Sequence, residues 1–295
     1  MAYRFKRKET IPDASRRVIG EQLAGLLSKV QAVEPGAVHD ARLRTKMLRA
    51  LLQLIRETCP PQALRRADAA LEKIARALAP VRDAEVRLKT FDAVLARTSP
   101  QGLQRHAQVR SLLQAQAATA RQLSLTPSDL RDVVALATTA QTQLAALPIE
   151  GRGWRAIGPG LTRAYRRGRK CLAAAVEDPT PEKRHEWRKQ VKLLAAHLRL
   201  LQSCQPRKLN RHARQLEALG ARLGTEHDLA VLRQHLALHA RRSRSLAAFA
   251  GIIDLLDTRR AAVRRRADAL GRKLYRAKPA AFSTRLRRAW EKWRG

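Results

Sequence analysis

Apolar residues recur at three- and four-residue spacing along most of the chain, and proline and glycine interrupt the pattern at intervals. Val18, Leu23, Leu26 and Val30 illustrate the spacing in one segment. It places apolar side chains on one face of an α-helix, where they can be buried. β-branched residues are sparse and no useful stretch alternates with period two, so the pattern predicts an all-α protein.

The breaks divide the chain into helices and suggest two halves. Helices are expected at about 12–33, 39–55, 62–79, 81–97, 103–123 and 128–147, then at about 161–176, 181–204, 207–223, 226–242 and 246–277, with a short basic tail after residue 279. The stretch from Pro148 to Pro159 carries two prolines and several glycines near the midpoint of the chain. We therefore predict an N-terminal helical repeat at 1–147 and a C-terminal one at 148–295.

Two of the predicted helices carry a stripe of basic residues beside their apolar side. One stripe contains His39, Arg42, Lys46 and Arg49, and the other contains His185, Arg188, Lys189, Lys192 and Arg199. At ~100° per residue, the first set falls within an arc of roughly 80°. Charged faces of helices are usually exposed to solvent and bind nothing. The alternative interpretation is that the two stripes are solvated faces of this kind.

The stripes belong to an internal repeat. His39, Arg42 and Lys46 recur 146 residues later as His185, Arg188 and Lys192, whereas Arg82-Asp83 recurs as His227-Asp228, and Cys59 as Cys204, after 145 residues. Two similar units commonly pack about a pseudo-two-fold axis. We expect two tandem helical bundles so related, with the stripes facing each other across a basic central groove; units that lie apart are the alternative.

The overall charge indicates the kind of partner. The 295 residues include 60 Lys and Arg against 25 Asp and Glu, a net charge of +35, and from residue 148 onward there are 36 basic and 12 acidic residues against 24 and 13 before it. So strongly cationic a protein favours a polyanionic partner. Hydrophobic residues make up 45%, which is ordinary for a packed domain and argues against a disordered basic tail.

Sequence motifs for catalysis, metal binding and membrane insertion are missing. The three cysteines form no C-x-x-C pair, no P-loop, G-x-S-x-G or H-E-x-x-H motif occurs, and His235 and His239 at i and i+4 have no third ligand nearby. We therefore expect no enzyme activity, no metal and no cofactor. Without a signal peptide or a run of 18 apolar residues, we also expect a cytoplasmic protein with no membrane partner.

The duplicated H-x-x-R-x-x-x-K stripe resembles the CHAD domain, the conserved-histidine α-helical domain, over about residues 12–290. The segment Leu-Gly-Thr-Glu-His-Asp-Leu-Ala-Val-Leu at 223–232 adds to the resemblance. The resemblance implies two pseudo-symmetric helical bundles, a basic channel or groove between them, and binding of inorganic polyphosphate, often at polyphosphate granules. The repeat departs from a regular pattern at Arg44, which corresponds to Gln190, and at Arg82, which corresponds to His227.

The chemistry of polyphosphate agrees with this composition. A charged phosphate chain without base or sugar requires dense cations, and an arginine fork binds two phosphate oxygens at once. The predicted polyphosphate-binding residues are Arg16, Arg17, His39, Arg42, Lys46, Arg49, Arg82, Arg166, Arg169, Lys170, His185, Arg188, Lys189, Lys192, Arg199 and His227. The histidines could instead cap or pack their helices, and Asp83 and Asp228 are expected to hold a basic side chain in place.

Two other functions remain open at this stage. A duplex nucleic acid bound through its phosphates would use the same cations, although an aromatic content of 4% disfavours stacking on single strands. The second open function is that of a scaffold, which would coat a storage granule or dock to an acidic protein. The sequence leaves the oligomeric state open.

Overall fold

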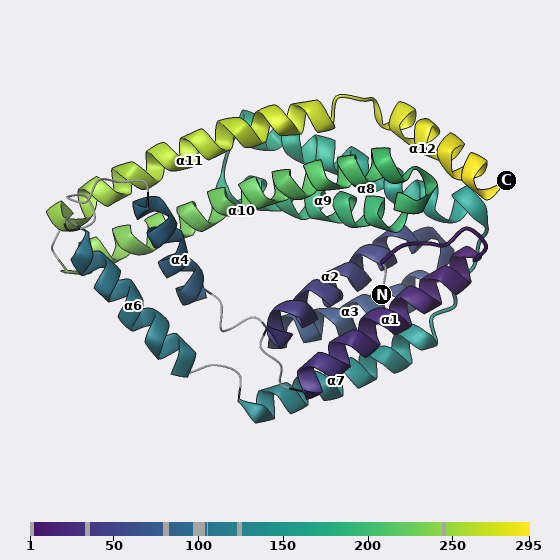
Figure 1. The fold of residues 1–295 in the computed structure, drawn as a ribbon, viewed down its shortest axis with the longest axis horizontal. Coiled ribbons are helices and arrows are strands. Elements are labelled where there is room, and N and C mark those ends of the chain that lie inside the picture. Colours follow the sequence, from purple (N-terminus) through teal and green to yellow (C-terminus); the bar gives the residue numbers. More distant parts are fainter. Residues whose placement is uncertain are drawn as a thin grey trace.

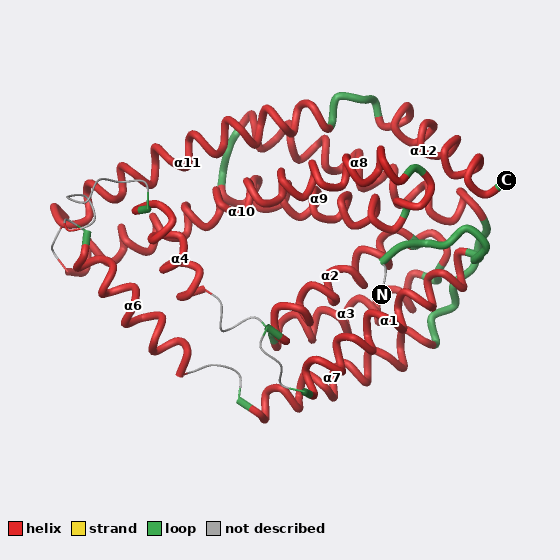
Figure 2. Tube along the Cα trace, viewed as in Figure 1, coloured by secondary structure: helices red, strands yellow, loops and turns green. Residues whose placement is uncertain are grey.

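The computed structural model describes residues 3–32, 36–78, 83–96, 104, 106–122, 126–243 and 246–295. Within these ranges the regular structure is entirely helical and contains no strand (Figure 2). The prediction of an all-α protein is therefore confirmed.

The helices follow the apolar periodicity of the sequence and mostly end at its prolines and glycines. In the first half they are α1 (Ile11–Gln31), α2 (Ala37–Leu54), the short 3-10 helix η1 (Arg56–Thr58), α3 (Pro61–Ala77), α4 (Asp83–Leu95), α6 (Ala107–Gln122) and α7 (Pro127–Ala145). In the second half they are α8 (Gly153–Glu177), α9 (Pro181–Leu200), the 3-10 helix η2 (Gln202–Cys204), α10 (Pro206–Ser243), α11 (Leu246–Leu274) and α12 (Pro279–Arg294).

Three predicted boundaries in the second half are wrong. Helix α8 begins at Gly153 and not near residue 161, with Pro159 on its exposed side, so the connection between the halves is shorter than expected. Helix α10 is continuous, although the sequence was divided at residues 224–225. The expected basic tail is helix α12, which buries Phe282, Leu286 and Trp290. In α8 and α10, tertiary packing outweighs the local preference of Pro159 and Gly224, whereas α12 begins at Pro279, where proline is favoured as the first helical residue.

One large hydrophobic core contains residues from both halves of the chain. In Figure 1, α1, α2, α3 and α7 lie on one side of the molecule and α8, α9 and α12 on the other. Residues from both sides share one buried cluster, including Leu51 of α2, Leu161 of α8 and Leu198 of α9. Gly160 allows α8 to lie directly on the end of α2, because an added Cβ there would be 2.1 Å from the carbonyl oxygen of Leu54.

A second, smaller core lies at the far end of α10 and α11. There Phe91 of α4 and Leu113 of α6 are buried with Leu232 of α10 and Ile252 of α11. Helices of the first half thus complete a core of the second half, as the position of α4 and α6 in Figure 1 shows. Along the sequence, the two halves are separated by the connection between α7 and α8, near residues 146–152. In space they are not separate, because both halves contribute residues to both cores.

The order of elements repeats between the halves. The series α1, α2, η1, α3 and α4 corresponds to α8, α9, η2 and the two ends of α10. Equivalent elements also touch, since α2 packs on α9 and α4 packs on α10. The pseudo-two-fold relation of two tandem bundles stays a prediction.

None of the described helices is sufficiently long and apolar to span a membrane.

Candidate polyanion-binding surface

Helix α9 separates an apolar side from a basic side. The hydroxyl oxygen of Thr180 accepts the backbone N–H of Lys183 at 3.3 Å and caps the helix. Trp187, Val191 and Leu194 are fully buried on one side. On the other side Lys189 and Lys192 are exposed, so α9 presents its cations to solvent while its apolar side holds it in the core.

A buried ion cluster fixes α9 against α10 and α11. Arg184 donates from Nε and Nη2 to Oε2 of Glu226 at 2.9 and 2.5 Å, and from Nη1 to Oδ1 of Asp268 at 2.5 Å. The side chains of Arg184 and Glu226 are only 5% and 2% exposed, and the guanidinium also lies 5.0 Å from the ring of Trp187. Because a buried ion pair tolerates little displacement, this cluster sets the register between α9 and α10.

Arg184 is not among the residues predicted from the sequence, although its position in the sequence carries a signal. Arg184 precedes His185 directly and lies three residues before Trp187, so it falls on the apolar side of a helix and not in the stripe. An arginine in that position requires a buried carboxylate partner. Glu226 supplies it, whereas Asp228, which was expected to hold a basic residue, has no ion pair in the part of the chain that the structure describes.

The register set by Arg184 brings the α9 stripe onto the seam with α10. The rings of His185 and His227 lie 5.2 Å apart, centroid to centroid. One turn further on, the guanidinium of Arg188 lies over Gly224, where an added Cβ would be 2.9 Å from Nη2. The stem of Lys192 lies against Gly220, at 3.5 Å from such a Cβ. The glycines thus leave room for the two basic side chains along the seam.

Burial and neighbouring charge lower the pKa of His185. Burial is the largest cause, and the positive charges of Lys189 and Arg188, together with His227, add to it. The imidazole is therefore mainly neutral at neutral pH. A bound anion would oppose this repulsion and favour the protonated ring.

The stripe of α2 lies in the equivalent place, along the seam with α3. His39 and Lys46 are exposed. Arg42 donates from Nη1 to the carbonyl oxygen of Leu78, at the end of α3, at 2.5 Å. Arg49 binds Asp68 of α3 through two hydrogen bonds of 2.8 and 2.9 Å, which raise its pKa. This stripe therefore also combines exposed cations with arginines that hold the neighbouring helix.

The two helices that carry the stripes contact each other. Nε2 of the fully buried His197 on α9 lies 2.9 Å from the carbonyl oxygen of Ala50 on α2. Burial lowers the pKa of His197 to about 4, so the ring is neutral and donates this hydrogen bond. In Figure 1 the two ribbons separate towards their N-terminal ends. Lys46 lies only ~40° around α2 from Ala50, so it faces the side that meets α9.

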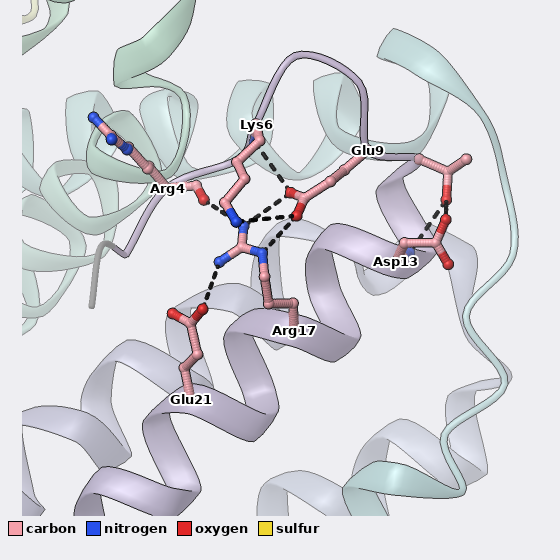
Figure 3. Close-up of polar contacts among 7 residues, drawn as sticks. Arg4, Lys6, Glu9, Asp13, Arg17 and Glu21 are labelled. Atoms are coloured by element: carbon pink, nitrogen blue, oxygen red, sulfur yellow. Dashed lines mark hydrogen bonds and ion pairs between the residues drawn. The ribbon is translucent and has the colours of Figure 1, made fainter.

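Two further predicted arginines serve mainly to hold the fold. Arg17 donates to Glu9 at 2.6 Å, to Glu21 at 3.1 Å and to the carbonyl oxygen of Arg4 at 2.8 Å, which ties the N-terminal segment to α1 (Figure 3). Arg199 binds both carboxylate oxygens of Glu217 on α10, at 2.8 and 2.7 Å. These carboxylates raise the pKa of both arginines, and they offset much of the charge that a polyanion could use.

Four other predicted residues, on α1 and α8, lie away from the two seams. Arg166, Arg169 and Lys170 are exposed on α8, and Nη1 of Arg169 donates to the carbonyl oxygen of Ala277 at 3.3 Å. Arg16 is exposed on α1, 3.8 Å from Asp13. Arg82 lies outside the described residues. The structure therefore gathers the stripe residues and His227 at the seams and leaves the α8 cations on another surface.

Two histidines that resembled half of a metal site have other contacts. Nε2 of His235 lies 2.8 Å from the side-chain oxygen of Gln116, and the ring of His239 lies 5.7 Å from that of Phe249. Over the described ranges, no three His, Cys, Asp or Glu side chains come close enough to hold a metal ion. Both histidines contribute instead to the packing of α10 against α6 and α11.

Comparisons with known proteins agree with this architecture. The family model of the CHAD domain matches residues 17–237. PptA from Streptomyces chartreusis has a similar structure, with a TM-score of 0.63 and 16% identity over 89% of this chain and 96% of that one. The CHAD domain from the plant Ricinus communis gives a TM-score of 0.60 and 20% identity over 94% and 96%. Among curated proteins, none matches this chain.

Proposed function

Because this chain belongs to the CHAD-domain family, we propose that it binds inorganic polyphosphate through the stripes of α2 and α9. The observation that carries the proposal is the placement of the stripes on two helices that contact each other through His197 and Ala50. Lys46, Lys189 and Lys192 remain exposed on these helices. A phosphate chain that runs along both seams would meet them on a single path, which is the basic central groove.

The proposed interaction is mainly electrostatic. A polyphosphate chain offers only charged oxygens, so its affinity should come from cations that replace its counterions. Arg188 can bind two oxygens at once, whereas the flexible lysines follow a chain of variable shape. His185 and His227 add hydrogen-bond donors at one end of the α9 stripe. Binding without catalysis, in the cytoplasm and at polyphosphate granules, is part of the same proposal.

A charge-reversal variant tests the proposal. The variant K46E/K189E/K192E changes three exposed lysines of the stripes and spares Arg42 and Arg188, which pack against α3 and α10. A matched control reverses three exposed cations of α3 and α7: Arg66, Lys73 and Arg131. Both variants have the same net charge, so a difference between them reports position and not overall charge.

The expected result is a loss of affinity in the stripe variant alone. In titrations with long-chain polyphosphate, its affinity should fall at least about tenfold, and the slope of log affinity against log salt should drop by about 2. Circular dichroism should show equal helicity in both variants. Equal affinity of the two variants would move the site away from the stripes. Preference for duplex DNA over polyphosphate at physiological salt would instead favour a nucleic-acid-binding function.

A further inference from the structure

A second basic surface covers the outer face of α8. Arg163, Arg166, Arg167 and Lys170 follow one another at three- and four-residue spacing on this helix, and Arg56 of η1 lies close to them. Arg163 pairs with Glu57, yet burial and the repulsion of Arg56, Arg167 and Arg166 lower its pKa. Positive charge therefore exceeds the negative charge available on this face.

The surface continues into an open groove between α8 and α11. The groove has a volume of about 390 Å³, and its lining includes Arg169 of α8, Arg272 of α11 and Arg276, which lies between α11 and α12. Glu177 is the acidic residue in its lining, and Leu172 and Val176 contribute apolar wall. No ion pair with a carboxylate involves these three arginines within the described ranges. They are therefore available to an external anion, with their aliphatic stems resting on the apolar wall.

The α8–α11 groove faces away from the α9 stripe. The indole of Trp187 on α9 packs on Gly271 of α11, beside Leu172, which also lines the groove. At ~100° per residue, His185, Lys189 and Lys192 lie roughly 140–160° around α9 from Trp187. The side of α9 that meets α11 and Leu172 is therefore roughly opposite to its stripe, whereas Glu186, which pairs with Lys189, interacts with Arg167 of α8. A ligand in the α8–α11 groove cannot at the same place contact the α9 stripe.

We propose that the outer face of α8 with the α8–α11 groove is a second polyphosphate-binding surface, so that one protein chain holds two phosphate chains or two distant segments of one. The inference rests on the proposed function, because it assigns the same ligand class to a new site. Arg272 and Arg276 are the new binding residues. Arg166, Arg169 and Lys170, predicted to join the stripes, bind here instead.

The charge of the surface calls for a polyanion, and the size of the groove favours polyphosphate among polyanions. Nucleic acid and polyphosphate both supply closely spaced anionic oxygens, but a polyphosphate chain is thin and flexible enough to follow a groove of this volume between two helices. A bivalent protein gains avidity on a long chain, since binding at one surface raises the local concentration of the chain at the other. It also bridges separate chains, which a protein with one site does not.

A sandwich assay separates the two surfaces. Biotinylated long-chain polyphosphate is immobilised, the full chain is bound to it and washed, and fluorescent polyphosphate is then added. The variant R166E/R272E/R276E changes three exposed cations of the second surface, and R66E/K73E/R131E again serves as the charge-matched control. Mass photometry of each protein without polyphosphate verifies that all are in the same oligomeric state.

The expected result is that the unmodified protein and the control retain the fluorescent chain, whereas R166E/R272E/R276E binds the immobilised chain but retains at least about tenfold less of the fluorescent one. Full retention by that variant would overturn the second site. Retention of fluorescent duplex DNA in place of fluorescent polyphosphate would also overturn it. If the unmodified protein fails to bind the immobilised chain at all, the proposed function fails, which the assay reports at an earlier step.

Discussion

Arg184 of α9 binds Glu226 of α10, and the next residue on each helix, His185 and His227, forms a second pair whose rings lie 5.2 Å apart. The buried ion pair holds the helices in the register that places the two half-buried histidines side by side. We therefore expect Arg184 to be a positioning residue for polyphosphate binding, although it faces away from the ligand.

Replacing Arg184 tests this role. Arg184→Ala leaves Glu226 as a buried, unpaired carboxylate, and it should lower the free energy of unfolding by about 3–5 kcal/mol in urea denaturation. The double variant R184M/E226Q removes both charges and should recover part of the loss. A decrease below about 1 kcal/mol in R184A would show that the ion cluster does not hold the helices.

Gly224 and Gly220 provide a matched pair on α10. Gly224→Ala places a methyl group where the guanidinium of Arg188 lies, at 2.9 Å from Nη2. Gly220→Ala makes only ordinary contacts, with the stem of Lys192 at 3.5 Å and with Val191 at 3.8 Å. Each substitution should gain up to about 1 kcal/mol of helix propensity. We expect G224A alone to weaken polyphosphate binding, because it displaces Arg188. Equal binding by G224A and G220A in titrations would exclude a contribution from the position of Arg188.

Polyphosphate affinity should increase as the pH falls below about 6.5, the ordinary pKa of histidine. The pKa of His185 is lowered in the free protein, and a bound anion raises it, so the complex takes up protons. The increase is at most about tenfold per pH unit for one proton. Titrations at constant ionic strength should show a weaker pH dependence in H185Q than in the unmodified protein and in H239Q, whose ring lies against Phe249. An equal dependence of affinity on pH in all three proteins would show that His185 does not take up the proton.

The stability of the fold should decrease in acid because of His197. Its pKa is about 4 in the folded protein, below the value of about 6.5 in an unfolded chain, so the unfolded state binds more protons. The neutral ring of His197 therefore contributes about 3 kcal/mol to the free energy of unfolding above about pH 6.5, and this contribution is lost as the pH falls towards 4. In H197L, which carries the residue found at the equivalent position Leu51, urea denaturation should show a correspondingly weaker pH dependence. An unchanged dependence would mean that the pKa of His197 does not differ between the folded and unfolded states.

The sequence predicted the helices and the two stripes because both depend on local periodicity. Burial of Leu51, Trp187 and Leu194 follows directly from their spacing. Continuity of α10 through Gly224 could not be predicted from local preference, because glycine weakens a helix and the reason for it here, the room it leaves for Arg188, comes from another helix. For the same reason, the sequence combined Arg169 with the stripes, whereas α11 draws it into a separate groove. Contacts between distant segments leave no periodic signal.

The buried ion cluster shows a second limit of the sequence. Arg184 stands among basic residues and resembles them in composition, yet its partners Glu226 and Asp268 lie on two other helices. Similarly, His197 could be placed on a helix but not paired with Ala50 of the first half. The stripes could therefore be recognised, but not the interactions that fix their positions.

Protection of individual lysines from acetylation tests the central claim most directly. The protein is treated with a limiting acetylating reagent with and without long-chain polyphosphate, and each lysine is quantified by mass spectrometry. Lys46, Lys189 and Lys192 should be protected by polyphosphate, while Lys73 on the far side of α3 should react equally in both samples. Equal modification of the three stripe lysines with and without the polymer, under conditions where it is bound, would contradict the account.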